Sequence, residues 1–139
     1  MSGQQARAGK GEQELMRLYI LFGILFRVVM VDLGRVRGVP LKLSYQAVFD
    51  WVLLELSRWA ERQHHRLRRL LRQQGCVVVS CRRQGHAYVV HYRQQGYLRE
   101  AVYSIEILRA ECQALVGKWV DTISERRRHH EGDACVEEG

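Results

Sequence analysis

Arginines gather at two places in this 139-residue chain, and their chemistry suits phosphate. A guanidinium group is planar, stays charged and donates two hydrogen bonds at once to a phosphate or carboxylate. One group follows helical spacing toward Gly75, and the other stands at the first turn of an alternating segment. The candidate nucleic-acid-binding residues are Arg62, Arg66, Arg69, Arg72, Arg82 and Arg83. The pattern predicts a basic surface that binds DNA or RNA, and a solvated arginine-rich face is the alternative.

The net charge of the chain fits an anionic partner. Lysine and arginine together number 22 against 15 aspartates and glutamates, which gives a formal net charge of +7 and a pI near 9.6. Such a charge favours association with polyanions, but it does not distinguish a nucleic acid from an acidic protein. A protein-interaction module that meets an acidic protein is therefore the second hypothesis.

Four residues with metal-ligand chemistry recur at equal intervals, namely Cys76, Cys81, His86 and His91. Side chains alternate between the two faces of a strand, so this odd spacing places two residues of the same strand on opposite faces. In the expected register Cys81 shares a face with His86, and Cys76 shares the other face with His91. Four such ligands cannot converge on one tetrahedral zinc ion, and the paired CxxC spacing of zinc modules is missing. We predict neither a metal nor another cofactor.

Catalytic signatures are absent from the sequence. No glycine-rich phosphate loop, GxSxG or HExxH occurs. Cys81 and His86 are close in sequence, but the cysteine is expected to point into the core. Glu100 and Glu106 stand near Arg99 and Arg109, which indicates surface ion pairs. We predict a protein that is not an enzyme.

The first predicted element is a helix from about Glu12 to Leu33, ended by Gly34. Its middle, Leu18 to Phe26, is apolar on every side and must be buried in a core, an oligomer or a bilayer. A strand over Phe26 to Leu33 is the alternative, because β-branched valines are frequent there. Charged residues within the apolar window oppose a membrane span. We expect this segment to lie in the core or in a homodimer interface.

A second, longer helix has clear signals at both ends. Ser44 is a suitable N-cap and Gly75 a suitable residue just past the C-terminus. Between them one stripe repeats at intervals of three or four. Its members are Tyr45, Val48, Val52, Leu56, Trp59, Gln63, Leu67, Leu70 and Gln74.

The alternating segment from Val77 to Tyr103 predicts a three-stranded antiparallel meander. A two-residue turn at Gln84 and Gly85 would pair Arg83 with His86. This register places Val77, Val79 and Cys81 opposite Tyr92, Val90 and Tyr88 on the core face. Arg93 to Gly96 forms the second turn. In the third strand Leu98 and Val102 are expected to point inward.

Ser104 is the expected cap of a last helix. Its inner stripe is Ile105, Leu108, Cys112, Leu115, Trp119 and Ile123. The predicted architecture is α+β, with two N-terminal helices, the meander and a C-terminal helix. Hydrophobic residues make up 47% of the chain, enough for a packed core. We predict one domain over residues 12–128, with flexible tails at 1–11 and 129–139.

The sequence as a whole predicts a cytoplasmic, non-enzymatic binding or regulatory protein. The first hypothesis is nucleic-acid binding through the helix end and the hairpin tip. A homodimer is expected to bury part of Leu18 to Phe26, since a wide apolar surface usually marks an interface. Membrane association through the apolar first helix is the remaining alternative.

Overall fold

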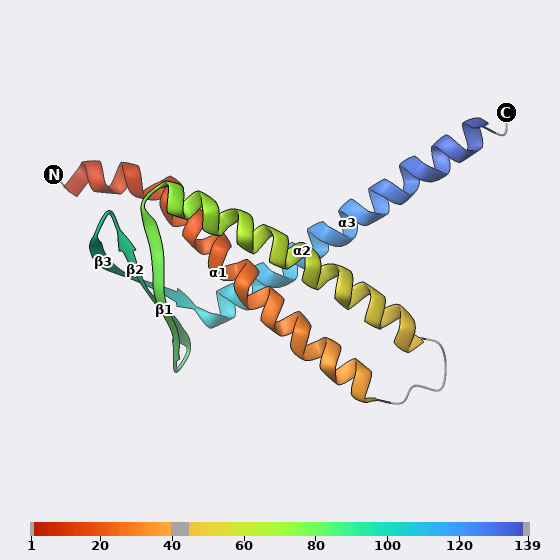
Figure 1. Ribbon diagram of the computed structural model, residues 1–139, viewed down its shortest axis with the longest axis horizontal. Helices are drawn as coiled ribbons and strands as arrows, with labels where there is room; N and C mark the ends of the chain where they lie inside the picture. The colour runs from red at the N-terminus through yellow and green to blue at the C-terminus, as the bar shows by residue number, and fades with distance from the viewer. Residues whose placement is uncertain (1, 40–44, 138–139) are drawn as a thin grey trace.

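The computed structural model describes residues 2–39 and 45–137 of the chain (Figure 1). The elements follow in the order α1 (Ser2–Gly38), α2 (Tyr45–Gln73), β1 (Cys76–Gln84), β2 (Ala87–Gln94), β3 (Tyr97–Ser104) and α3 (Ile105–Glu137). The predicted α+β architecture is confirmed. The expected N-cap Ser44 lies outside the described residues.

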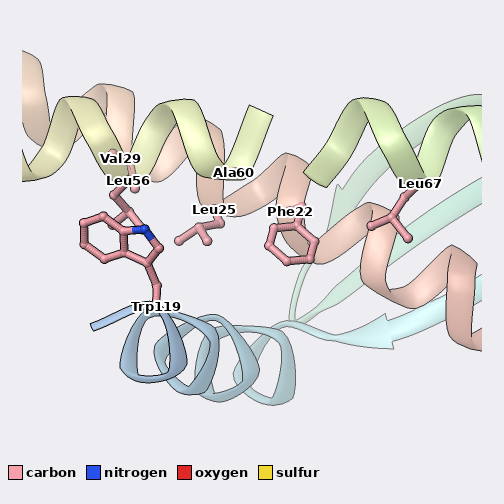
Figure 2. Close-up of a cluster of buried hydrophobic side chains, with 7 residues drawn as sticks. All are labelled: Phe22, Leu25, Val29, Leu56, Ala60, Leu67 and Trp119. Carbon is pink, nitrogen blue, oxygen red and sulfur yellow. The ribbon is translucent and has the colours of Figure 1, made fainter. Parts of the chain in front are cut away.

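The two long helices α1 and α2 form an antiparallel hairpin, and α3 crosses it (Figure 1). The largest contact brings together apolar residues at helical spacing from all three helices, as Figure 2 shows. Its buried members are Phe22, Leu25, Val29, Leu56, Ala60, Leu67 and Trp119. Trp119 is the buried anchor that α3 contributes, with 8% of its surface exposed. The predicted inner stripe of the last helix is confirmed at Leu108 and Trp119, which are both buried.

Helix α1 is longer than predicted at its C-terminal end. It continues through Gly34 to Gly38, and the alternative strand over Phe26 to Leu33 is wrong. A single glycine lowers helix stability by only about 1 kcal/mol, which the contacts of α1 with α2 offset. Here Gln46 donates its side-chain amide to the carbonyl of Val36, and Arg37 pairs with Asp50 at 2.5 Å.

The apolar segment Leu18 to Phe26 is covered within the chain itself. Ile20, Leu21, Phe22 and Leu25 are each at most 6% exposed. This segment is therefore a core element, one of the two expected places for it, and a single chain does not test whether a homodimer buries its partly exposed residues. Among residues 2–39 and 45–137, no helix combines the length and apolar character that a membrane crossing needs. The homodimer itself stays a prediction.

Helices also occupy most of the stretches predicted as tails. Helix α1 begins at Ser2 and α3 runs to Glu137, although the first residue in either hydrophobic cluster is Leu15. The single domain over 12–128 and the flexibility of residues 1–11 and 129–139 stay predictions.

The sheet has the order β1-β2-β3, and both pairs are antiparallel. One face packs on α1 and the end of α2. The buried members of this second cluster are Met16, Ile20, Leu71, Cys76 and Val90. Cys81, Tyr88 and Tyr92 also face it, as predicted, but the predicted register is wrong, because Cys81 lies opposite Val90 and Tyr88 lies opposite Arg83.

A β-bulge changes which residues of β1 face the core. The register shifts between Val78 and Ser80, so Val79 is an extra residue in the strand. Cys76 and Val78 therefore point inward, whereas Val77 and Val79 are about half exposed. The prediction that Val77 and Val79 face the core is wrong, because strict alternation cannot anticipate a bulge.

The turns and the third strand also differ from the prediction. Gln84 pairs with Ala87, so Gly85 and His86 form the first turn instead of Gln84 and Gly85. In β3 the inward residues are Ala101 and Tyr103. The predicted Leu98 and Val102 are 66% and 60% exposed and lie on the outer face. This face carries exposed apolar side chains on both edge strands.

Candidate nucleic-acid interface

The arginines of α2 point away from the core. With 3.6 residues per turn, positions 58, 62, 66, 69 and 72 lie opposite the buried positions 56, 60, 67 and 71. All five of these arginines are exposed. The predicted apolar stripe explains their direction, because packing its far half on α1 fixes the rotation of the helix. The first two members of the predicted stripe do not point into the core, since Tyr45 and Val48 are 58% and 57% exposed.

Most of these charges have no neutralising partner among the side chains that the structure describes. Arg58 pairs with Glu55 at 3.0 Å, and His65 lies 3.7 Å from Glu61. The other four of the five exposed arginines form no ion pair with any residue whose side chain the structure describes. We call this group the arginine face; it consists of Arg62, Arg66, Arg69 and Arg72. It extends about 15 Å along the helix at 1.5 Å per residue.

An exposed tryptophan extends the same side of α2. Trp51 is 57% exposed and precedes Arg58, Arg62 and Arg69 by two, three and five turns in helical register. Trp51 is not among the residues predicted from the sequence. The separations of 7, 11 and 18 residues, read from the sequence, carry the signal.

The hairpin tip is a separate basic place. Cys76 begins β1 next to the end of α2, and Arg83 lies seven residues on, about 23 Å away along an extended strand. Figure 1 shows the end of α2 and the β1–β2 turn at opposite ends of β1. Arg82 lies beside Val89 on the outer face, and Arg83 lies beside Tyr88 on the other face. The six predicted residues therefore do not form one surface.

His64 lies between the arginine face and the core, where its charged form is disfavoured. Its ring stacks on Tyr19 with centroids 4.3 Å apart and an interplanar angle of 14°. Gly23 makes room for it, since a Cβ at that position would lie 3.0 Å from Nε2 of His64. Burial lowers the pKa of His64, and the nearby charges of His65, Arg68 and Arg27 lower it further.

Three polar side chains form a row across the outer face of the sheet, and the sequence did not reveal it. Oγ of Ser80 lies 3.3 Å from Nδ1 of His91, and Nε2 of His91 lies 3.1 Å from Oε2 of Glu100. Glu100 was expected to form a surface ion pair near Arg99 and Arg109, but its partner in the described chain is His91. Although serine, histidine and carboxylate resemble a nucleophile and base, this row lies on an open sheet face. We interpret it as a cross-strand contact that fixes register.

The cysteines and histidines are distributed differently from the prediction. Cys76 and Cys81 both face the core, whereas His91 lies on the outer face. The expected sharing of one face by Cys76 and His91 is wrong, because the bulge at Val79 inverts the start of β1. Within the described part of the chain, no cluster of three or more His, Cys, Asp or Glu side chains is arranged to hold a metal ion.

Comparison with known proteins places this arrangement in a family. Residues 7–124 match the family described as YhjD protein. The chain belongs to the YhjD protein family. The YhjD match covers α2, the sheet and α3 as far as Ser124, so the arginine face and the hairpin tip both lie within it. No curated protein matches the chain. No solved structure matches it either.

Proposed function

We propose that this protein is a non-enzymatic nucleic-acid-binding protein whose arginine face contacts the phosphate backbone. The observation that carries the proposal is the alignment of Arg62, Arg66, Arg69 and Arg72 on one exposed side of α2, without a carboxylate partner in the described chain. Unpaired arginines at this density repel one another, and a row of phosphates would relieve the repulsion. A cytoplasmic location is part of the proposal.

Trp51 favours a single-stranded ligand. Single-strand binding combines a basic track for the backbone with aromatic rings on which bases stack, at about 1–3 kcal/mol per base. Trp51 supplies an exposed ring on the side of α2 that carries the arginine face. The hairpin tip, with Arg82 and Arg83, serves as an independent second contact, because β1 separates it from α2.

Salt-dependent binding tests the proposal. Fluorescence anisotropy would measure affinity for labelled oligo(dT) and for a mixed-sequence duplex between about 50 and 200 mM salt. The test variant changes Arg62, Arg66, Arg69 and Arg72 to Gln. The control variant changes the exposed residues Arg35, Arg93, Lys118 and Arg126 to Gln, which removes the same net charge elsewhere.

We expect the log–log salt slope to fall by about three in the test variant, since each phosphate contact contributes about 0.7–0.9. The control variant should keep most of the wild-type slope. Trp51→Leu should weaken oligo(dT) binding by about tenfold and duplex binding much less, because only unpaired bases can stack on the ring. Equal losses of affinity in the test and control variants would mean that net charge alone drives binding, and this would contradict the proposal.

Absence of binding by the wild-type chain to either ligand at about 50 mM salt would refute nucleic-acid binding. The basic side of α2 would then point to an acidic protein partner. A pull-down with the wild-type chain, the test variant and the control variant would search for that partner.

A further inference from the structure

A cavity of about 700 Å³ lies between the N-terminal part of α1 and the core side of the sheet, away from the outward side of α2. Its size suits a small molecule. In Figure 1 the first turns of α1 pass the end of the sheet where β2 joins β3. We call it the tyrosine pocket; the lining residues that matter here are Glu12, Arg17, Cys76, Tyr92, Arg99 and Tyr103.

One carboxylate oxygen of a residue that lines the tyrosine pocket lacks a hydrogen-bond donor. Oε2 of Glu12 is shielded from solvent and has no hydrogen-bond partner in the described part of the chain. A buried acceptor without a donor is costly, and more so when it is charged. A ligand that brings an N–H group would remove that cost.

The charge of the pocket is opposite to that of the whole chain. Arg17 is already neutralised, because it pairs with Glu14 at 2.5 Å and with Glu111 at 2.6 Å. Glu100, which also borders the pocket, is engaged by His91 on the outer face. Arg99 is exposed and forms no ion pair with Glu12. The pocket is lined by three carboxylates, Glu12, Glu14 and Glu100, against Arg17 and Arg99, which is an excess of one negative charge in a chain of net charge +7.

The remaining walls are neutral and largely aromatic. Burial raises the pKa of Tyr103 to about 12 and that of Tyr92 above its usual value, so both phenols stay protonated. Burial likewise keeps the Cys76 thiol neutral by raising its pKa. Aromatic rings attract organic cations through their faces and pack against apolar groups. Glu12 supplies the charge and the tyrosines supply the apolar contact.

We propose that the tyrosine pocket binds a small primary amine in its cationic form, with the ammonium group on Glu12 and an apolar body against Tyr92 and Tyr103. A primary ammonium donates the hydrogen bond that Oε2 of Glu12 lacks. A quaternary ammonium has no N–H and cannot do so. This site is independent of the arginine face.

Isothermal titration calorimetry with phenethylamine tests the site, with phenylethyl alcohol as a neutral probe of the same shape and the trimethylated amine as a probe without N–H. We expect saturable binding of phenethylamine and at least about tenfold weaker binding of the other two, as for a lost charged hydrogen bond. Glu12→Gln should weaken phenethylamine by a similar factor. Glu125→Gln, an exposed change of equal charge on α3, should not.

Circular dichroism would verify that both variants are folded, and amide shifts in two-dimensional NMR should map phenethylamine to Glu12, Tyr92 and Tyr103. The proposal is overturned by equal binding of phenethylamine and the alcohol, by wild-type affinity in Glu12→Gln, or by no saturable binding up to about 10 mM phenethylamine, a limit that corresponds to only about 3 kcal/mol.

Discussion

Both burial and neighbouring charges affect the pKa of His64. It is partly buried beside Tyr19, and burial, followed by the positive neighbours, lowers its pKa. A lowered pKa means that the folded chain favours neutral histidine more than the unfolded chain does. The unfolded chain therefore binds more protons between the two pKa values, and stability rises with pH across that interval.

This linkage predicts a pH-dependent stability that belongs to one side chain. The contribution of His64 is fully present above its unfolded pKa, about 6.5, and is lost as pH falls toward the lower folded pKa. Thermal unfolding midpoints measured from about pH 8 to pH 5.5 should fall less steeply in His64→Gln than in wild type. His65→Gln, at the exposed neighbouring position, should retain the wild-type slope. Parallel curves for wild type and His64→Gln would contradict this account.

At the scale of residues, the sequence predicted positions that follow from one periodicity. The exposure of Arg62, Arg66 and Arg69 follows from the apolar stripe on the opposite side of α2. Ser80 and His91 could not be paired in advance. Their contact depends on the first turn, because the pairing of Gln84 with Ala87 places Ser80 opposite His91, and the predicted turn at Gln84 and Gly85 gives a different register.

Among the elements, the junction between α2 and β1 depends on a glycine. Gly75 has φ of +75° and donates its N–H to the carbonyl of Arg72 at 3.0 Å, which closes the helix end. Its own carbonyl accepts from the N–H of Gln95 at 2.9 Å and so connects the junction to the β2–β3 turn. An added Cβ would meet Gln95 at an ordinary 3.5 Å, so the penalty of a larger residue lies in the backbone.

Gly75→Ala should destabilise the chain by about 1–2 kcal/mol, the cost of a left-handed conformation for a residue with a Cβ. Urea unfolding followed by circular dichroism would measure it. Gly117→Ala is the matched control, because Gly117 lies within α3 with no atom near its added methyl group. That change should stabilise by about 0.5–1 kcal/mol through helix propensity. Equal effects of the two substitutions would rule out the backbone explanation.

The order and type of elements could be predicted, whereas some boundaries could not. Gly75 ends α2 as predicted because its positive φ suits the chain reversal, but Gly34 lies within α1 and does not end it. The same residue type has different consequences because contacts with α2 continue beyond Gly34, through Val36 and Arg37. Tertiary packing of this kind overrides local propensity.

The candidate binding regions lie at three separate places on the molecule. The arginine face points outward from the helical hairpin, the hairpin tip lies at the far end of β1, and the tyrosine pocket lies between α1 and the sheet. The sequence indicated the basic residues but predicted one surface for them. The distance between the end of α2 and the hairpin tip depends on the length and direction of β1, which the structure provides. A large nucleic acid can reach both basic places, whereas a small ligand cannot.

The start of α2 offers the predicted homodimer an exposed apolar surface. The inner side of α2 is buried at Leu56, which lies in the cluster with Trp119, but toward the start of the helix the same side is exposed at Tyr45 and Phe49. Figure 1 shows α3 leaving the hairpin beyond this crossing, so the start of this side loses its cover. The inner side is continuous with the core, so an equivalent surface from a second copy of the chain suits it.

Light scattering at about 10 µM protein should therefore give twice the monomer mass of 16.3 kDa, a concentration well above the Kd of a typical stable interface. Tyr45→Ser combined with Phe49→Ser should reduce it to the monomer mass with unchanged circular dichroism, since both side chains are already about half exposed in the monomer. Trp51→Ser removes a similarly exposed apolar side chain from the outward side of the same turns and should leave the dimer intact. A wild-type chain that remains monomeric would refute the dimer, and a Trp51→Ser monomer would place the interface on the side of α2 that carries the arginine face.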